Sequence, residues 1–526
     1  MARTSAPGSN EDSQAEVIAY LGSGHAFGGA KPIQIETHAA RVFLAGDRAW
    51  KIKRAVRYPY LDFSTLEQRH RVLRSELELN RRTAPDMYLG LWPITRDAER
   101  DLHVAGPGEI VEWILEMQRF PDAALLSVIA DHGGLDEMLL TRLATRIADF
   151  HRTALIVETD DGAARMRRVI EGNIRSAGRY RDLLAEDRVA ELSNNQCVKL
   201  ASLSSLLDMR ARAGRIRHCH ADLHLANIAM IDSEPTLFDC LEFDSELASI
   251  DVLYDLAFLL MDLWQRDAHR EAGIVFNRYL DLSAEDELGV ALLPLFMSVR
   301  ASIRAHVSAA SALSGREVMM CAARSYLNLA LGLLAPERPR LIAIGGLSGT
   351  GKSTLARHVA GEVGVAPGAR VIRTDVIRKR LAGIAIEERL PKESYTPEAS
   401  RHVYATSLHL AAHALASGQS VILDAVFAEP DDRQAVAALA DRLGLTFIGL
   451  WLEAPDARRL DRIAKRSPDA SDADVPVARA QKAIPIARDE LHRWTCVGSE
   501  QEISDLASQV KALISGSAGS AGKAGL

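Results

Sequence analysis

The sequence predicts two domains in one chain, an α+β domain followed by an α/β domain with a parallel sheet. The first observation is length, because 526 residues exceed what one ordinary domain holds. The second is the order of elements before residue 333, where short strands come first and helices follow. The third is the pattern after residue 340, where apolar strands alternate with helices.

The boundary between the two patterns lies at "LLAPERPR", residues 333–340, where two prolines and alternating charges end a long helical region. Directly after it, "LIAIGG" begins the first apolar strand of the new pattern. We therefore predict a first domain over residues 1–335 and a second over 336–515. The Gly/Ser/Ala composition of residues 516–526 cannot build a core and predicts a flexible tail.

Composition limits the class of protein. A hydrophobic content of 48% and a charged content of 25% are typical of a soluble globular protein. No apolar run reaches the ~18 to 20 residues of a membrane span, and the N-terminus lacks the apolar core of a signal peptide. The five cysteines are scattered without a C-x-x-C pair, which fits a reducing cytoplasm. We expect a cytoplasmic protein with no membrane partner.

Net charge argues against nucleic acid as a partner. Residues 336–526 hold 25 Lys+Arg and 23 Asp+Glu, a balance of +2, and the remainder holds 63−25=38 against 70−23=47, a balance of −9. Neither part has the basic excess expected of a non-specific nucleic-acid binder.

Short strands open the first domain. "ARVFLAG" and "RAWKIK" are predicted strands, followed by a helix and then by "GEIVEWILEM" as another strand. The helix is expected to open with a capping box, Ser64-Thr65-Leu66-Glu67. Among the later helices, "IAMI", a turn at "DSEP" and "TLFD" predict a hairpin.

The stretch "RHCHADLHLANIAM" contains His218, His220, Asp222 and His224. A metal site is one interpretation, because alternate residues of an extended segment point the same way and His and Asp bind zinc. The other interpretation uses Asn227, five positions after Asp222, and Asp239, a dozen further on. That is the spacing of a kinase catalytic loop, H-x-D-x-x-x-x-N, followed by a metal-binding aspartate.

Phosphoryl transfer explains these residue types. An acceptor hydroxyl must be oriented and must lose its proton, which is the task of a carboxylate such as Asp222. Mg²⁺ prefers oxygen ligands, which Asn227 and Asp239 supply. His220 and His224 would then hold the loop by hydrogen bonds.

A kinase of this kind also needs a lysine on an early strand and a glutamate on the next helix. In "DRAWKIKRAV", Ala49 and Lys51 share one strand face, as in the A-x-K of V-A-I-K, and Lys53 on the same face is the alternative. On the helix, Glu76 falls within the apolar arc and Glu78 opposite it. Because a buried acid needs a partner, we expect Glu76 to pair with Lys51.

Residues from about 37 to 330 resemble the aminoglycoside phosphotransferase and choline kinase branch of the protein-kinase-like fold, through "HADLHLAN", "FDCLEFD" and "DVLYDLAFLL". The resemblance implies an ATP- and Mg²⁺-dependent kinase in which Asp255 anchors the catalytic loop. A G-x-G-x-x-G near the start is missing, Ala221 stands where protein kinases carry arginine, and A-P-E does not follow Asp239. A small-molecule acceptor is therefore implied.

The second domain opens with a complete phosphate-binding motif. "GLSGTGKS" is a G-x-x-x-x-G-K-S between an apolar strand and a helix, and its residues are Gly346, Gly349, Gly351, Lys352 and Ser353, followed by Thr354. We expect the backbone N–H groups of this loop to face phosphate oxygens, Lys352 to reach the β- and γ-phosphates, and Ser353 to ligate Mg²⁺.

Further candidates follow the motif. Asp375 and Arg378 come at the end of the second strand, and Asp424 ends another apolar strand at the position expected for a carboxylate near Mg²⁺. A later helix carries arginines at three- and four-residue spacing before the acidic "PDASDADVP", namely Arg459, Arg462 and Arg466.

Residues from about 340 to 515 resemble small kinases of the gluconate kinase, zeta toxin and polynucleotide kinase type. The resemblance implies that Asp375 serves the acceptor hydroxyl, that Arg378 holds the acceptor, and that Arg462 and Arg466 close over the phosphates. Two interpretations stay open beside it: a solvated helix face for the arginines and a helix N-cap for Asp375.

Together the motifs predict an ATP-dependent phosphotransferase with two nucleotide sites, using Mg²⁺ and small-molecule acceptors. In one alternative, the first domain is a regulatory or binding module and only the P-loop domain uses ATP. In another, the P-loop domain is a nucleotide switch that gates the first domain.

Overall fold

A computed structural model describes residues 14–37, 39–58, 61–313, 318–465, 469–481 and 491–520. The chain forms two compact units. The first unit comprises Met1–Thr159 and Ala213–Leu256, and the second comprises Asp160–Arg212 and Ala257–Leu526. The predicted boundary at residues 335 and 336 lies inside the second unit, between helix α11 (Val318–Gly332) and strand β13 (Arg340–Gly345).

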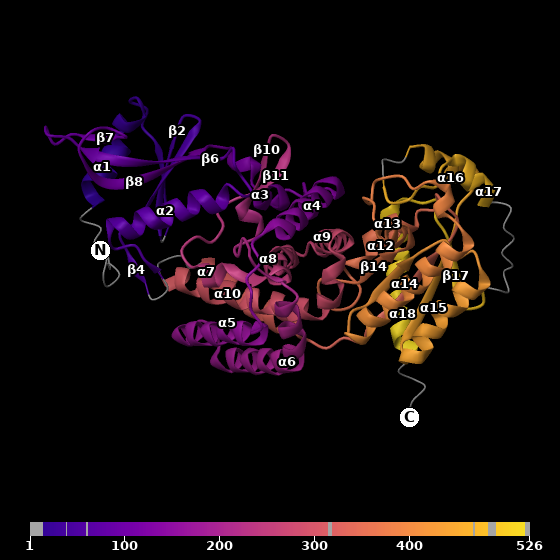
Figure 1. Ribbon diagram of the computed structural model, residues 1–526. Helices are drawn as coiled ribbons and strands as arrows, with labels where there is room; N and C mark the ends of the chain where they lie inside the picture. Colours follow the sequence, from indigo (N-terminus) through magenta and orange to yellow (C-terminus); the bar gives the residue numbers. More distant parts are fainter. Residues whose placement is uncertain are drawn as a thin grey trace. The chain divides into compact units, whose positions relative to one another are not determined.

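The first unit is built on an antiparallel sheet of six strands (Figure 1). Their order is β1 (Ile33–Glu36), β2 (Ala40–Ala45), β3 (Arg48–Lys53), β8 (Glu109–Gln118), β6 (Tyr88–Arg96) and β7 (Leu102–Val104). Strands β2, β3 and β8 confirm the three predicted strands. One face packs on helix α1 (Ala15–Ser23) through Phe43, Ile52 and Ile114, and helix α2 (Leu66–Asn80) packs on β6 and β8.

Helix α2 starts one residue later than predicted. Its N-cap is Thr65, whose hydroxyl accepts from the Gln68 N–H while the Gln68 side chain accepts from the Thr65 N–H. The predicted box with Ser64 and Glu67 is therefore wrong. The Ser64 hydroxyl instead donates to the Asp62 carboxylate over 2.6 Å, so it does not cap the helix.

The rest of the first unit carries the loop with the histidines. Strand β9 (Ile216–His218) pairs with β12 (Ser249–Asp251), and the predicted hairpin is present as β10 (Ile228–Ile231) and β11 (Glu234–Leu237). Its turn is reduced to two residues in the left-handed conformation, Asp232 and Ser233. Helices α3 (Leu126–Asp131), α4 (Glu137–Thr153) and α7 (Ser245–Ala248) complete this part, and helix α8 (Val252–Gln265) starts in it.

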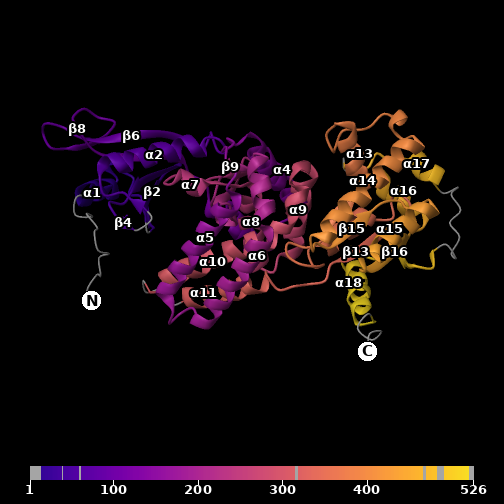
Figure 2. The same cartoon turned by 60° about the horizontal axis from the view of Figure 1, so that its bottom comes forward.

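Helices make up the first part of the second unit (Figure 2). They are α5 (Gly162–Ala177), α6 (Glu186–Arg212), α9 (His269–Leu282), the 3₁₀ segment η6 (Ala284–Leu292), α10 (Leu293–Leu313) and α11. The continuous helical stretch Ala284–Leu313 is long and apolar enough to cross a membrane, which the sequence analysis did not anticipate. Of its most apolar window, 83% is buried inside the protein, and α10 packs against α11 and α5.

The second part of this unit is a five-stranded parallel sheet, which confirms the predicted α/β architecture. The strand order is β14 (Arg370–Arg373), β15 (Val421–Asp424), β13, β16 (Thr446–Glu453) and β17 (Trp494–Gly498). Helices α12 (Lys352–Ala360) and α18 (Ile503–Ser520) cover one face, and α14 (Pro397–Ala416) and α15 (Pro430–Leu443) the other. The predicted tail begins within α18, and residues 521–526 lie outside the described part of the chain.

Edge strand β14 is covered by helix α9. The Asn277 side chain accepts from the Val371 N–H over 2.7 Å and donates to the Ala369 carbonyl over 3.1 Å. At the helix crossing, a Cβ on Gly361 would lie 1.9 Å from the His269 carbonyl oxygen, so only glycine permits this approach. These contacts explain why α9 belongs to the same compact unit as the parallel sheet.

Candidate active sites

The first site is organised by two lysines on strand β3. Because side chains alternate along a strand, Lys51 and Lys53 face away from the core residue Ile52 between them. The Lys51 Nζ lies 2.6 Å from Glu76 Oε1 and 2.8 Å from Asp239 Oδ1. The Lys53 Nζ lies 2.7 Å from Glu76 Oε2 and 2.5 Å from Glu242 Oε1. A single buried carboxylate therefore holds both lysines.

The two lysines differ in their access to solvent. The Lys51 side chain is 12% exposed and pairs with Asp239, which is 43% exposed, whereas Lys53 is 3% exposed and pairs with the largely buried Glu242. Although burial lowers it, the carboxylates of Asp239 and Glu76 raise the pKa of Lys51 well above its ordinary value. Lys51 is thus the lysine that lies at the open side of the cluster.

Helix α2 supplies the glutamate and a second contact. Glu76 is fully buried, and Glu78 is exposed and pairs with Arg74 one turn earlier, as the helical arc predicted. The Asn80 amide donates to the Glu76 carbonyl and accepts from the Cys240 N–H over 2.9 Å. No local pattern in the sequence indicated this link to the segment that carries Asp239.

The catalytic-loop candidate is anchored by Asp255 on the first turn of α8. One oxygen of its carboxylate accepts from the His220 N–H over 3.0 Å, and the other from the Ala221 N–H over 2.8 Å. Ala221 has a φ of 66°, a left-handed conformation that costs a non-glycine residue about 1–2 kcal/mol. The two hydrogen bonds stabilise that conformation. The anchoring role that the family resemblance implied for Asp255 is therefore present as a contact.

Within the loop, Asn227 lies against Asp222. Its Nδ2 donates to the Asp222 carbonyl over 3.0 Å and to the Asp222 carboxylate over 2.8 Å. This orientation leaves the Asn227 amide oxygen as the atom that can face a cation. The His220 Nε2 donates to the Phe238 carbonyl over 2.9 Å, and the His224 Nδ1 accepts from the Ala226 N–H. Both histidines thus hold the loop by hydrogen bonds, as predicted.

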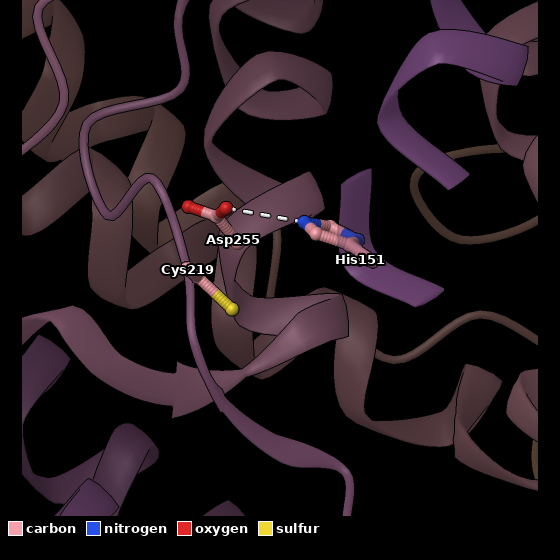
Figure 3. Close-up of side chains that lie close together, drawn as sticks. All are labelled: His151, Cys219 and Asp255. Atoms are coloured by element: carbon pink, nitrogen blue, oxygen red, sulfur yellow. Dashed lines mark hydrogen bonds and ion pairs between the residues drawn. The ribbon is translucent and has the colours of Figure 1, made fainter. Parts of the chain in front are cut away.

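The four residues of the zinc interpretation do not gather as a metal-binding group in the described part of the chain. The group that does is His151, Cys219 and Asp255, whose ligand atoms lie within 4.8 Å of one another (Figure 3). The His151 Nε2 lies 3.1 Å from the Asp255 carboxylate. Both Asp255 oxygens already accept hydrogen bonds from backbone N–H groups. The cluster of His151, Cys219 and Asp255 is therefore explained as the anchor of the catalytic loop. His151, on α4, has no motif around it that would have revealed this role.

The oxygen atoms of the first site suit magnesium. Asp239 adopts a φ of 57° and is held by its N–H, which donates to the Tyr88 hydroxyl over 3.1 Å. Although burial raises it, the Lys51 ammonium holds the pKa of Asp239 below its ordinary value, so its carboxylate stays ionised. A carboxylate and an amide oxygen, from Asp239 and Asn227, are donors that this hard cation prefers.

The second site is the loop between β13 and α12. Gly346, Gly349 and Gly351 all have positive φ, and a Cβ at Gly346 or Gly349 would lie 2.6 Å from a carbonyl oxygen. Helix α12 begins at Lys352, so its first N–H groups open toward the loop. The Lys352 Nζ donates to the Leu347 carbonyl over 3.2 Å. Ser353 and Thr354 lie in the first turn of α12.

The carboxyl ends of neighbouring parallel strands bring the other candidates to this loop. The Ser353 hydroxyl donates to Asp424, at the end of β15, over 2.5 Å. The Arg373 Nε, at the end of β14, lies 3.5 Å from the same Asp424 oxygen. A hydroxyl and a carboxylate at this distance form an oxygen pair that suits Mg²⁺.

Asp375 and Arg378 lie on helix α13 (Thr374–Ala382). Asp375 is in the first turn, and the N-cap position is Arg373, so the N-cap interpretation of Asp375 is wrong. Burial and the nearby Asp424 carboxylate raise the pKa of Asp375. Arg378 donates to the Ser394 carbonyl and the Ser400 hydroxyl, and its guanidinium lies 4.8 Å from the centre of the Tyr395 ring.

The arginines of helix α16 (Asp456–Ala464) differ from one another. Arg459 is 3% exposed and donates to the Ser348 carbonyl over 2.9 Å. This hydrogen bond holds the backbone of the P-loop. Arg462 donates to the Thr350 and Ser499 carbonyls and lies beside the loop. The interpretation of both as a solvated face is therefore wrong. Arg466 lies outside the described residues.

Comparisons with known proteins find similarity to the C-terminal part of the chain and to most of its length. Residues 341–484 match the AAA domain family AAA_33. Two uncharacterised proteins, from Mycobacterium tuberculosis and Mycobacterium bovis, are each 32% identical over 475 residues, which is 89% of this chain and 92% of theirs. The match to both therefore extends across both units.

Solved structures of low sequence identity also match parts of the chain. A choline/ethanolamine kinase family protein from Mesorhizobium loti is 12% identical and covers 61% of this chain and 95% of its own, with a TM-score of 0.36. An APS kinase from Mycobacterium tuberculosis, in complex with AMPPNP and APS, is 20% identical and covers 34% of this chain and 99% of its own, with a TM-score of 0.27.

Proposed function

This chain belongs to the same family as the two mycobacterial proteins, and we propose that it is an ATP-dependent phosphotransferase with two nucleotide sites. The first unit acts as a small-molecule kinase of the aminoglycoside phosphotransferase type, and the P-loop part of the second unit acts as another. The observation that carries the proposal is the Lys51 ammonium, which bridges the buried Glu76 and the more exposed Asp239.

In the first unit, Lys51 contacts a phosphate of ATP while Glu76 holds its ammonium in place. Asp222 orients the acceptor hydroxyl and takes its proton. Asp239 and Asn227 would hold Mg²⁺, which when bound supplies positive charge against the phosphate oxygens. Lys53 forms a second ion pair with Glu242. The same ammonium contacts Oε2 of Glu76, the carboxylate oxygen that Lys51 does not contact, and so fixes Glu76 in place.

In the second unit, the loop N–H groups and Lys352 bind the β- and γ-phosphates. Ser353 and Asp424 would hold Mg²⁺. Asp375 takes the proton of the acceptor hydroxyl, and its raised pKa suits a proton acceptor. Arg378 holds the acceptor, and Arg462 and Arg466 close over the phosphates.

The acceptors are small molecules in both sites. For the first site, the support is Ala221, which stands where a protein kinase carries the arginine that reads a phosphorylated activation loop. For the second, the support is the charge balance of +2 over residues 336–526 (25 Lys+Arg, 23 Asp+Glu), which is too small for a nucleic-acid cleft. We place the protein in the cytoplasm, without a membrane partner.

The contacts favour a working first site over a regulatory module. Lys51, Glu76 and Asp239 form one chain of ion pairs, and Asp222 and Asn227 form one hydrogen-bonded pair. A kinase that had lost its activity should have lost at least one of these five residues, and all five are present.

The test is transfer of labelled phosphate from γ-labelled ATP into a metabolite extract, with wild type, Asp222→Asn and Lys352→Ala run in parallel. We expect one labelled product that disappears with Asp222→Asn and survives Lys352→Ala, and another with the opposite dependence. If every product depends on Lys352 and none on Asp222, the first unit is not a kinase.

A matched pair on helix α2 controls for folding. Glu76→Gln removes the buried carboxylate between the lysines, and we expect it to abolish the Asp222-dependent product. Glu78→Gln changes the same residue type two positions away, in an exposed pair with Arg74, and should leave both products unchanged.

A further inference from the structure

The acceptor side of the P-loop site is held by helical residues that precede the parallel sheet. Asp375 lies between two arginines, five positions from each, because Arg370 begins strand β14 and Arg380 lies near the end of helix α13. Both arginines contact one buried carboxylate, that of Glu287 in the η6 segment. The Glu287 Oε1 lies 2.6 Å from Arg370 Nη2 and 3.0 Å from Arg380 Nη1. A single acid therefore ties both ends of the segment that carries Asp375.

Arg380 also closes the end of helix α9. Its Nε donates to the Asp281 carbonyl over 3.1 Å, and its Nη2 donates to the Leu280 carbonyl. Both carbonyls belong to the last turn of α9, where a helix has no following turn to supply N–H partners. A guanidinium at this position also meets the negative end of the helix dipole. Arg380 thus joins helix α13 to the C-terminal end of α9.

Helix α13 directs its two arginines to different sides. At about 100° per residue, positions 378 and 380 lie roughly 200° apart around the helix axis. The Arg378 guanidinium lies 4.8 Å from the centre of the Tyr395 ring, whereas Arg380 contacts α9 and η6. Leu282, the last residue of α9, packs against the apolar cluster that contains Val376 of α13. The face of α13 that meets α9 is therefore distinct from the face that carries the proposed acceptor arginine.

Helix α9 is fixed at its other end to the helix that follows the P-loop. A Cβ on Gly361, directly after α12, would lie 1.9 Å from the His269 carbonyl oxygen, and a Cβ on Gly273 would lie 3.0 Å from the Gly361 nitrogen. Backbones in such close contact have little room to shift against each other. Because α12 begins at Lys352, α9 connects the phosphate-binding helix to the helix that carries Asp375.

The first residue of α13 lies at the magnesium side of the P-loop. The Thr374 hydroxyl donates to the Asp424 carbonyl over 3.4 Å, and the Asp424 carboxylate accepts from Ser353 over 2.5 Å. Strands β14 and β15 also pair Arg373 with Asp424 in register. A shift or rotation of α13 would therefore move Asp375 relative to the P-loop serine, while the P-loop itself could stay in place.

We propose that Arg380 is a positioning residue of the P-loop site: anchored on Glu287 and on the end of α9, it sets the place of helix α13 relative to the phosphates. The inference rests on the proposed function of that site. Arg380 acts through Asp375 and Arg378, because their distance from the γ-phosphate depends on where α13 lies. Residues 269–287 would then serve the second reaction, although they fall within the stretch from about 37 to 330 that resembles the first kinase.

The experiment uses the full chain in an Asp222→Asn background, so that γ-labelled ATP and a metabolite extract give only the Lys352-dependent product. Initial rates are measured over a series of ATP concentrations for Arg380→Gln and for its parent. We expect the rate at saturating ATP to fall about 100-fold, the loss typical of a reacting group misplaced by about 1 Å. KM for ATP should change less than about two-fold, because the contacts with the phosphates are retained.

Two further variants control for charge and folding. Arg380→Lys keeps a cation near Glu287 but loses the fork that reaches two carbonyls, so we expect a rate between those of Arg380→Gln and the parent. Arg442→Gln removes an exposed arginine in the last turn of α15 and should leave the rate and KM unchanged. Urea unfolding followed by far-UV circular dichroism shows that each variant is folded at the assay temperature. Glu287 keeps its contact with Arg370 in all three.

The outcomes distinguish this inference from the proposed function. If Arg380→Gln unfolds at lower urea but forms product at the parent's rate, Arg380 only stabilises the fold and the positioning role is refuted. A rise in KM for ATP that accounts for the whole loss would show damage to the phosphate site, which also refutes it. If Arg380→Gln does not fold, Arg380→Lys carries the same test. If the parent forms no Lys352-dependent product, the proposed function of the P-loop site fails and this inference fails with it.

Discussion

Arg370 and Glu287 form a buried two-point ion pair in the second unit, with Nη2 2.6 Å from Oε1 and Nε 3.1 Å from Oε2. Arg370 begins edge strand β14, and Glu287 lies in the η6 segment. The same guanidinium lies 2.9 Å from Asp281 and donates to the Asn277 side chain. The strand that leads to Asp375 is therefore fixed by a helical segment whose Glu287 lies 83 residues before Arg370 in the sequence.

Replacement of Arg370 by methionine should destabilise the second unit. Asp281 and Glu287 would remain buried with less positive charge near them, although Arg380 still contacts Glu287 over 3.0 Å. Removal of one partner of a buried ion pair costs about 3–5 kcal/mol of stability, and we expect the free energy of unfolding to fall by an amount near the lower end of this range. Urea unfolding followed by far-UV circular dichroism measures it. Lys465→Met, in an exposed pair with Asp461, should cost less than about 0.5 kcal/mol; equal costs would contradict the assignment.

Lys51→Met and Lys53→Met should separate catalysis from stability. Lys51→Met leaves Glu76 paired with Lys53, so we expect a near-normal unfolding midpoint and loss of the Asp222-dependent product. Lys53→Met leaves the buried Glu242 without this ammonium and should lower the free energy of unfolding by about 3 kcal/mol. Phosphate transfer and urea unfolding on both variants check this. The reverse pattern would make Lys53 the phosphate-contacting lysine.

Asp255→Asn should disrupt the catalytic loop. One oxygen of the carboxylate becomes an NH₂ group, which cannot accept a hydrogen bond, so one of the two bonds from the His220 and Ala221 N–H groups is lost and the left-handed Ala221 loses support. We expect at least a 100-fold loss of the Asp222-dependent product. Cys219→Ala should retain both the product and the metal content measured by elemental analysis. Bound zinc that disappears with Cys219→Ala would restore a metal function for His151, Cys219 and Asp255.

The stability of the second unit should fall as pH decreases from about 6.5 to about 4. Burial, with a smaller contribution from Arg179, lowers the pKa of His306 to about 4 from an ordinary 6.5. Between these values the unfolded chain binds a proton that the folded chain does not, so unfolding becomes more favourable by up to about 3 kcal/mol. His306→Gln should flatten this dependence in urea unfolding at a series of pH values. His402→Gln, at an exposed position, should not; equal slopes would contradict the prediction.

Local sequence patterns predicted much of the fold and several residues of the two candidate sites. The alternation of apolar strands with helices predicted the parallel sheet, and G-x-x-x-x-G-K-S predicted a loop of positive-φ glycines before helix α12, because both depend on neighbours in the chain. The helical arc of α2 distinguished Glu76 from Glu78 for the same reason. Strands β1, β6 and β7 were missed, since β1 and β7 are only four and three residues long and β6 contains Gly90 and Pro93.

Only the tertiary structure decided which charges meet. The sequence favoured Lys51 and kept Lys53 as the alternative, because both occupy the same strand face. Their difference comes from Asp239 and Glu242, which lie more than 180 residues away in the chain. Likewise, no local signal joins Arg370 to Glu287 or His151 to Asp255. Periodicity reports which face of an element is buried, but the partner of a buried charge depends on packing between elements that are distant in sequence.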